Sequence, residues 1–202
     1  MRRALPALAA MALPLALGAC ISVFPKAKPV QMYRFGDNVA APAQPLARPM
    51  LVAKGTIDFA AGTAGDRILT TRGTENAYIG QVRWTSPAAL MFDAALLRAF
   101  DQPGSPRLVE RGEPLVAPCT LRLDVRSFEA SYPGPSALVR VRATLIRNAD
   151  RTEIAEKMFE VSTPASDNRQ APIVAAFDVS VSKVIGDIRD WTSQNAPAAS
   201  AR

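Results

Sequence analysis

The chain has 202 residues and two cysteines, and it contains no histidine. Its 24 basic and 18 acidic side chains give a formal charge of +6, which is weak evidence for nucleic-acid binding. Without histidine, neither a Ser-His-Asp triad nor a Cys-His pair can form, and the commonest zinc sites lose their usual ligand. The sequence also lacks a glycine-rich phosphate loop. It therefore predicts a protein that is not an enzyme, with no cofactor, no metal and no nucleic-acid partner.

Residues 1–19 are typical of a lipoprotein signal peptide. Two arginines precede an apolar run that is too short to span a bilayer. The run ends in Leu17-Gly18-Ala19-Cys20, which resembles a bacterial lipobox, where the thiol becomes a thioether to diacylglycerol. We expect Cys20 to be lipidated and to become the first residue of the mature chain. The alternative is an ordinary signal peptide with a chance cysteine.

The residue after Cys20 indicates the membrane to which the lipoprotein is sorted. It is Ile21, and in enteric bacteria an aspartate at this position retains a lipoprotein in the inner membrane. Its absence predicts a lipid-anchored protein on the periplasmic side of the outer membrane. With Cys20 acylated, Cys119 has no partner for an intramolecular disulfide. Cys119 is then a buried apolar residue or, alternatively, a reactive thiol.

The first part of the mature chain is rich in proline and alanine. We interpret residues 20–49 as a lipidated N-terminus with a Pro-rich tether, interrupted by one short strand at residues 32–36. A folded domain is predicted over residues 50–194. It begins with strands around residues 50–54, 67–73 and 77–84. Next, Ser86 suits a helix N-cap and Pro87 the first helical position, so an amphipathic helix is predicted to run to just before Pro103.

Three long segments with alternating apolar residues follow a short strand at residues 107–110. They start at Cys119, at Leu138 and at Ile154, and they predict an antiparallel meander. If Tyr132 pairs with Ser136, Arg126 lies beside Arg142. The outward face then carries four arginines: Arg122, Arg126, Arg140 and Arg142. They indicate a surface for an acidic partner or anionic headgroups, and the alternative is an ordinary solvated face.

The last predicted element is a long amphipathic helix that starts near Pro172. Its apolar residues recur every three or four positions, and polar residues that include Ser180 and Arg189 lie between them. The apolar stripe is Val174, Phe177, Val181, Val184, Ile185, Ile188 and Trp191. We interpret the helix as covering the core, with a partner-binding or membrane-surface helix as the alternative. Residues 195–202 are predicted to form a disordered tail.

The order of these segments resembles one family. A lipobox, the segment Tyr33 to Gly36, the run RILTTRG…YIGQVRWTSP leading into a helix, the strand LDVRSFEASY and a long final helix occur in sequence. The chain is similar over residues 33–193 to the ABC-type transport auxiliary lipoproteins, which work with MCE-domain proteins. The segments Arg83 to Pro87 and Leu123 to Phe128 are the most specific. Thr85-Ser86 departs mildly from the residues that often follow this tryptophan.

The resemblance implies the fold and the function. The implied fold is a three-layer α/β/α domain with a mixed sheet that includes the meander, similar to the N-terminal domain of TolB. The implied function is an auxiliary component of an ABC/MCE system that moves phospholipid between the two membranes, and no catalytic residue is carried over. The expected partners are an MCE-domain protein and the outer membrane, with direct phospholipid contact and a homo-oligomer left open. The alternative is an assembly lipoprotein of another envelope machine, for lipopolysaccharide export or secretion.

Overall fold

The computed structural model describes residues 29–197. The predicted signal peptide, Cys20 and the tail beyond residue 197 lie outside this range. The elements, in chain order, are β1 (Gln31–Tyr33), β2 (Leu51–Phe59), β3 (Leu69–Arg72), β4 (Glu75–Tyr78), β5 (Val82–Trp84), α1 (Ala88–Phe100), β6 (Arg107–Val109), β7 (Cys119–Tyr132), β8 (Ser136–Arg147), β9 (Glu153–Pro164) and α2 (Gln170–Asn195). Within residues 29–197, neither helix is long and apolar enough to cross a membrane.

The sheet is built around β7, the longest strand. On one side β7 pairs antiparallel with β8, which pairs antiparallel with β9, so the predicted meander is confirmed. On its other side β7 pairs in parallel with β2 near its start and with β3 near its end. Strand β6 extends the β2 edge in parallel, and β4 forms a hairpin with β3. The mixed α/β class is thus confirmed.

One predicted strand is in fact two. The sequence predicts a single strand over residues 77–84, but the chain turns at Gly80 and Gln81, and Gln81 has a φ of 59°. A residue in this left-handed region cannot continue a strand. The first half of the predicted strand is therefore β4, which pairs with β3. The second half is β5, which forms a separate two-stranded parallel sheet with β1.

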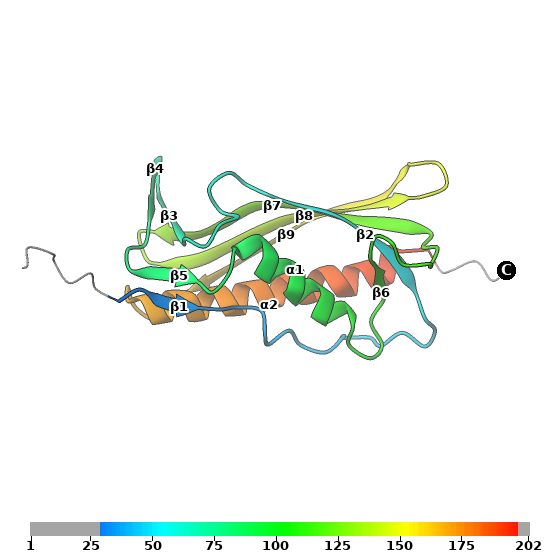
Figure 1. The fold of residues 1–202 in the computed structure, drawn as a ribbon, viewed down its shortest axis with the longest axis horizontal. Coiled ribbons are helices and arrows are strands. Elements are labelled where there is room, and N and C mark those ends of the chain that lie inside the picture. Colours follow the sequence, from blue (N-terminus) through cyan, green and yellow to red (C-terminus); the bar gives the residue numbers. More distant parts are fainter. Residues whose placement is uncertain (1–28, 198–202) are drawn as a thin grey trace, which may run out of the picture.

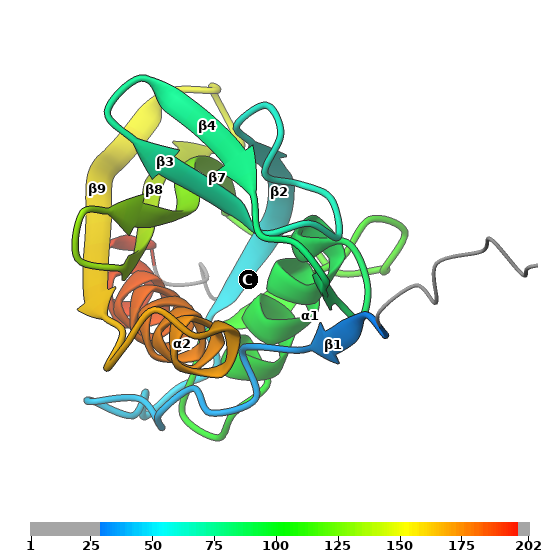
Figure 2. The same ribbon diagram turned by 90° about the vertical axis from the view of Figure 1, so that its left-hand side faces the viewer.

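Both helices lie on the same face of the curved sheet (Figure 2). Phe128 of β7 contacts Phe177 of α2, with ring centroids 5.1 Å apart, and Phe59 of β2 contacts Phe92 of α1 at 5.7 Å. Phe59 and Phe128 also contact each other at 5.8 Å. The expected three layers are therefore two. The reason is that the strands are apolar on one face only, so a second helical layer would have covered charged side chains.

Helix α1 begins without a side-chain cap. Pro87, not Ser86, occupies the N-cap of α1, and it makes no side-chain capping bond. The backbone N–H groups of Ala88 and Ala89 instead donate to the carbonyls of Gly65 and Ala64, which satisfies the free helix end.

Every residue of the predicted apolar stripe of α2 is buried, and the core-covering interpretation of this helix is confirmed.

The segment predicted as a tether is in part a component of the domain. Residues 34–50, here called the strap, run across the side of the helices that faces away from the sheet (Figure 1). Phe35 is buried against Trp84 and Phe128. The backbone N–H of Gly36 donates to Asp178 Oδ1 at 2.7 Å. An extended Pro-rich segment can pack in this way because side chains of the helices satisfy its backbone groups.

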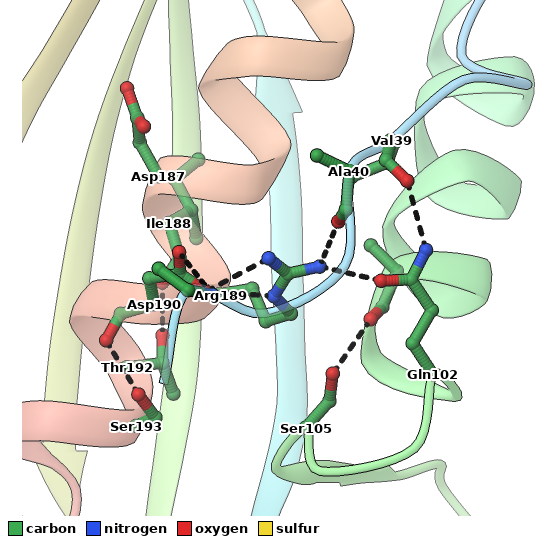
Figure 3. Close-up of polar contacts among 12 residues, drawn as sticks. Val39, Ala40, Gln102, Ser105, Asp187, Ile188, Arg189, Asp190, Thr192 and Ser193 are labelled. Atoms are coloured by element: carbon green, nitrogen blue, oxygen red, sulfur yellow. Dashed lines mark hydrogen bonds and ion pairs between the residues drawn. The ribbon is translucent and has the colours of Figure 1, made fainter. Parts of the chain in front are cut away.

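Arg189 of α2 lies under the strap, although the sequence places it on the polar side of the helix. Its side chain is 1% exposed. The guanidinium donates to the carbonyl oxygen of Ala40 at 2.6 Å and to Gln102 Oε1 at 2.7 Å, and it pairs with Asp190 at 2.9 Å (Figure 3). Gln102 in turn donates to the carbonyl of Val39 at 2.9 Å. Every nitrogen of the buried guanidinium thus has a partner, and the side chain links α2 and the residues just after α1 to the strap.

Candidate partner-binding site

The four predicted arginines lie on the face of the sheet that no helix covers. This surface, here called the open face, carries the outward side chains of β7, β8 and β9: Arg122, Asp124, Arg126, Arg140, Arg142, Glu156 and Glu160. The alternating burial along β7 and β8 places their apolar residues toward the helices. The prediction that these arginines point outward is therefore correct.

The pairing of β7 with β8 differs from the predicted register. Val125 pairs with Val141, whereas Phe128 pairs with Val139, because a β-bulge lies between Val125 and Ser127. Arg126 sits in this bulge, and Asp124 rather than Arg126 lies opposite Arg142. The expected contact between two arginines is therefore wrong. A bulge inserts one extra residue and changes the parity of every later pair, which a parity argument cannot foresee.

The open face carries three acidic side chains beside its four arginines, so it is close to neutral rather than strongly basic. Asp124 forms an ion pair with Arg126 at 2.8 Å and accepts a hydrogen bond from Arg142 at 3.3 Å. Glu160 of β9 pairs with Arg140 at 2.6 Å, and this hydrogen bond raises the pKa of Arg140 above its ordinary value. Residue types alone missed the two glutamates of β9. The available signal was that Glu156 and Glu160 share the parity of outward positions on the predicted third strand.

Arg122 differs from the other three arginines. It opens onto a groove of about 570 Å³ at the end of the sheet where β7 begins. The basic groove, as we call it, takes cationic side chains from four elements: Lys54, Arg111, Arg122 and Arg151. Glu110 is its one acidic lining residue. Lys54 is held by Asp93 at 2.7 Å, so the three arginines supply the free charge of the groove.

The site offers charge and hydrogen bonding rather than covalent chemistry. Cys119 is buried, and burial raises the pKa of its thiol to about 11, so it is protonated at neutral pH. The buried interpretation of Cys119 is thus confirmed. Among residues 29–197, no group of three or more Cys, Asp or Glu side chains is placed to hold a metal ion. What the arrangement can do is recognise a charged partner or an anion.

Comparison with known families decides what the domain is. The profile of the ABC-type transport auxiliary lipoprotein component family matches residues 37–189. The chain belongs to this family. The matched range includes most of the strap, α1, the whole meander and α2 as far as Arg189. It covers the open face and the basic groove, so both are surfaces of an auxiliary lipoprotein domain.

Solved structures share the fold of this auxiliary lipoprotein. A DUF330 protein of Xanthomonas campestris is 25% identical, with a TM-score of 0.72, and the match covers 80% of this chain and 94% of that one. An uncharacterised protein is 14% identical, with a TM-score of 0.59 and coverages of 80% and 97%. PelC of Paraburkholderia phytofirmans, a dodecamer, is 14% identical at a TM-score of 0.41, with coverages of 74% and 94%. That likeness is too low to carry an argument. No curated protein matches the chain.

Proposed function

We propose that this auxiliary lipoprotein is anchored to the outer membrane through Cys20 and serves an MCE-type ABC system that moves phospholipid between the two membranes. Family membership supports the transport role. The lipobox and the isoleucine after Cys20 support the anchor and its membrane. The signal peptide directs the chain to the periplasm.

The open face is the surface that we assign to the MCE-domain partner. The observation that carries this assignment is that three strands present a broad charged surface while both helices pack on the opposite face. Its charges are half exposed, since the side chains of Arg126, Arg140 and Arg142 are 47%, 41% and 38% exposed. Paired charges of alternating sign select a partner with the complementary pattern and reject others.

The test is co-purification from cells with the MCE-domain protein after crosslinking. Arg126→Glu combined with Arg142→Glu places two glutamates beside Asp124 and should abolish capture while leaving the fold intact. The matched control is Arg34→Glu with Arg169→Glu, because these exposed arginines also pair with aspartates but lie off the open face. The control should capture the partner as the wild type does.

Three results would contradict the proposal. Normal capture by the Arg126 and Arg142 variant would return the open face to an ordinary solvated surface. Capture of a lipopolysaccharide-export or secretion component by the wild type, in place of an MCE-domain protein, would favour the alternative function. A Cys20→Ser variant that still fractionates with the outer membrane at the mature size would refute the lipid anchor.

A further inference from the structure

The basic groove gathers most of the unused cationic charge in the described part of the chain. Within residues 29–197, twelve of the Lys and Arg side chains form ion pairs and three more lie over aromatic rings. The structure gives neither an ion pair, nor a side-chain hydrogen bond, nor an aromatic ring to four arginines in this range. These are Arg48, Arg111, Arg122 and Arg151. Three of the four line one groove.

The three groove arginines come from separate elements that the fold brings together. Arg122 projects from β7, Arg111 lies in the connection from β6 to β7, and Arg151 lies in the turn between β8 and β9. The side chains of all three are exposed. The three like charges repel one another, and Glu110 is the one acidic residue that lines the groove, so this arrangement costs stability unless an anion joins it.

Arg151 occupies a backbone position that favours glycine. Its φ is 62°, in the left-handed region, where a non-glycine residue is disfavoured by about 1–2 kcal/mol. Its N–H donates to the carbonyl of Arg147, so the turn geometry is fixed by the hairpin. Glycine would relieve this strain at once. An arginine is found there instead, and its side chain lines the groove. Strained residues of this kind concentrate at binding sites.

The number of donors indicates the ligand's chemistry. One guanidinium already engages both oxygens of a carboxylate through two parallel N–H groups. Three guanidinium groups around one groove exceed that need and suit a phosphate, which offers more oxygens and carries the stronger charge. The connection that carries Arg111 also contains two exposed aliphatic side chains. Leu115 and Val116 are 37% and 82% exposed. Segments that combine basic groups with exposed aliphatic residues are typical of surfaces that meet lipid.

We infer that the basic groove binds the phosphate of an anionic phospholipid headgroup, with Arg111, Arg122 and Arg151 as its ligands and Leu115 and Val116 against the lipid's apolar part. This inference rests on the proposed lipid-transport function for the source of the phosphate. The groove lies at the end of the sheet where β7 begins, and β1 lies at the opposite end (Figure 1). The headgroup site is therefore remote from the end at which the described chain starts.

The test measures binding directly, without any partner protein. The full acylated chain in neutral maltoside detergent is titrated with short-chain phosphatidylglycerol, short-chain phosphatidylcholine, inorganic phosphate and an oligoglutamate peptide, using calorimetry. We expect phosphatidylglycerol to bind at least about tenfold more tightly than the other three, because the charged hydrogen bonds act together with the aliphatic contact and the choline cation is repelled.

Two variants and one control assign the binding to the groove. Arg122→Gln and Arg151→Gly should each weaken phosphatidylglycerol binding about tenfold. Arg151→Gly should also raise the melting temperature, because it removes the left-handed strain, so its loss of binding cannot come from unfolding. Arg48→Gln, the unpaired arginine that does not line the groove, should bind as the wild type does.

The outcomes that would overturn the inference are distinct. Absence of phosphatidylglycerol binding, or wild-type affinity in Arg122→Gln and Arg151→Gly, would show that the groove is not the binding site. Inorganic phosphate binding as tightly as phosphatidylglycerol would show that the ligand is free phosphate rather than a lipid headgroup. Equal affinity for oligoglutamate would assign the groove to an acidic protein segment. Co-purification of the MCE-domain protein with the Arg151→Gly variant tests the proposed function, whereas calorimetry tests the headgroup site. Either proposal can therefore fail while the other holds.

Discussion

Replacing Arg189 with methionine tests whether the strap is a structural part of the domain. The substitution keeps most of the apolar stem and removes the guanidinium. It deletes the charged hydrogen bonds to Ala40 and Gln102, and it leaves Asp190 without its cation. Each bond between a charged and a neutral group contributes about 1.5–3 kcal/mol, and breaking a buried ion pair costs about 3–5 kcal/mol. Because Asp190 keeps 26% of its side chain exposed, we expect a loss of about 3–4 kcal/mol.

The assay is urea unfolding followed by tryptophan fluorescence, since Trp84 and Trp191 are both buried. The matched control is Lys183→Met, which removes an exposed ion pair with Asp187 from the same helix and should cost less than about 1 kcal/mol. The strap of Arg189→Met should also become sensitive to trypsin at the bond between exposed Arg34 and Phe35, because Phe35 is buried while the strap is closed. A loss below about 1 kcal/mol with an unchanged tryptic pattern would show that Arg189 does not hold the strap.

Two further perturbations test the core and the strap. Gly36 has a φ of 82°, and an added Cβ would lie 2.5 Å from the Cβ of Ala95, so Gly36→Ala should lower the free energy of unfolding by about 2–4 kcal/mol. Gly73→Ala, at a φ of 59° in open space, should cost only about 1–2 kcal/mol, and equal losses would contradict the close approach of strap and helix. The buried Cys119 thiol has its pKa raised to about 11, so the unfolded chain loses this proton first as the pH rises and stability falls between about pH 9 and 11. Relative to Cys119→Ala, measured by urea unfolding at each pH, the decrease should total about 2–3 kcal/mol, and parallel profiles would refute the shift.

Local pattern was sufficient to predict most elements of the core. The stripe from Val174 to Trp191 recurs at helical spacing, and the alternation after Cys119 fixes which side chains of β7 are buried. These signals need no knowledge of distant residues, since each follows from the period of a single element. The same reasoning located Arg122, Arg126, Arg140 and Arg142 on one face.

The features that could not be predicted from the sequence depend on contacts between segments that are distant in the chain. Arg189 and Ser180 occupy positions on α2 that look polar, yet both are buried. Ser180 Oγ lies 2.9 Å from the carbonyl oxygen of Ala137, and Arg189 meets the strap. Glu160, which pairs with Arg140 on the open face, is on β9, and the arginines of the basic groove come together only when β7 and two connections converge. The choice of partner at each of these positions is a tertiary property that no local period encodes.

The strap also sets the order in which the domain can be completed. Gly36 is separated by 142 residues from its partner Asp178, and Ala40 by 149 residues from Arg189. A ribosome makes the strap near the beginning and its partners near the end, so these contacts close only when almost the whole chain exists. During most of synthesis the strap has no α2 to pack against, and it stays accessible to any enzyme that processes an N-terminus. Closing the strap is then a late folding step, and it converts a segment that was free during synthesis into part of the finished surface.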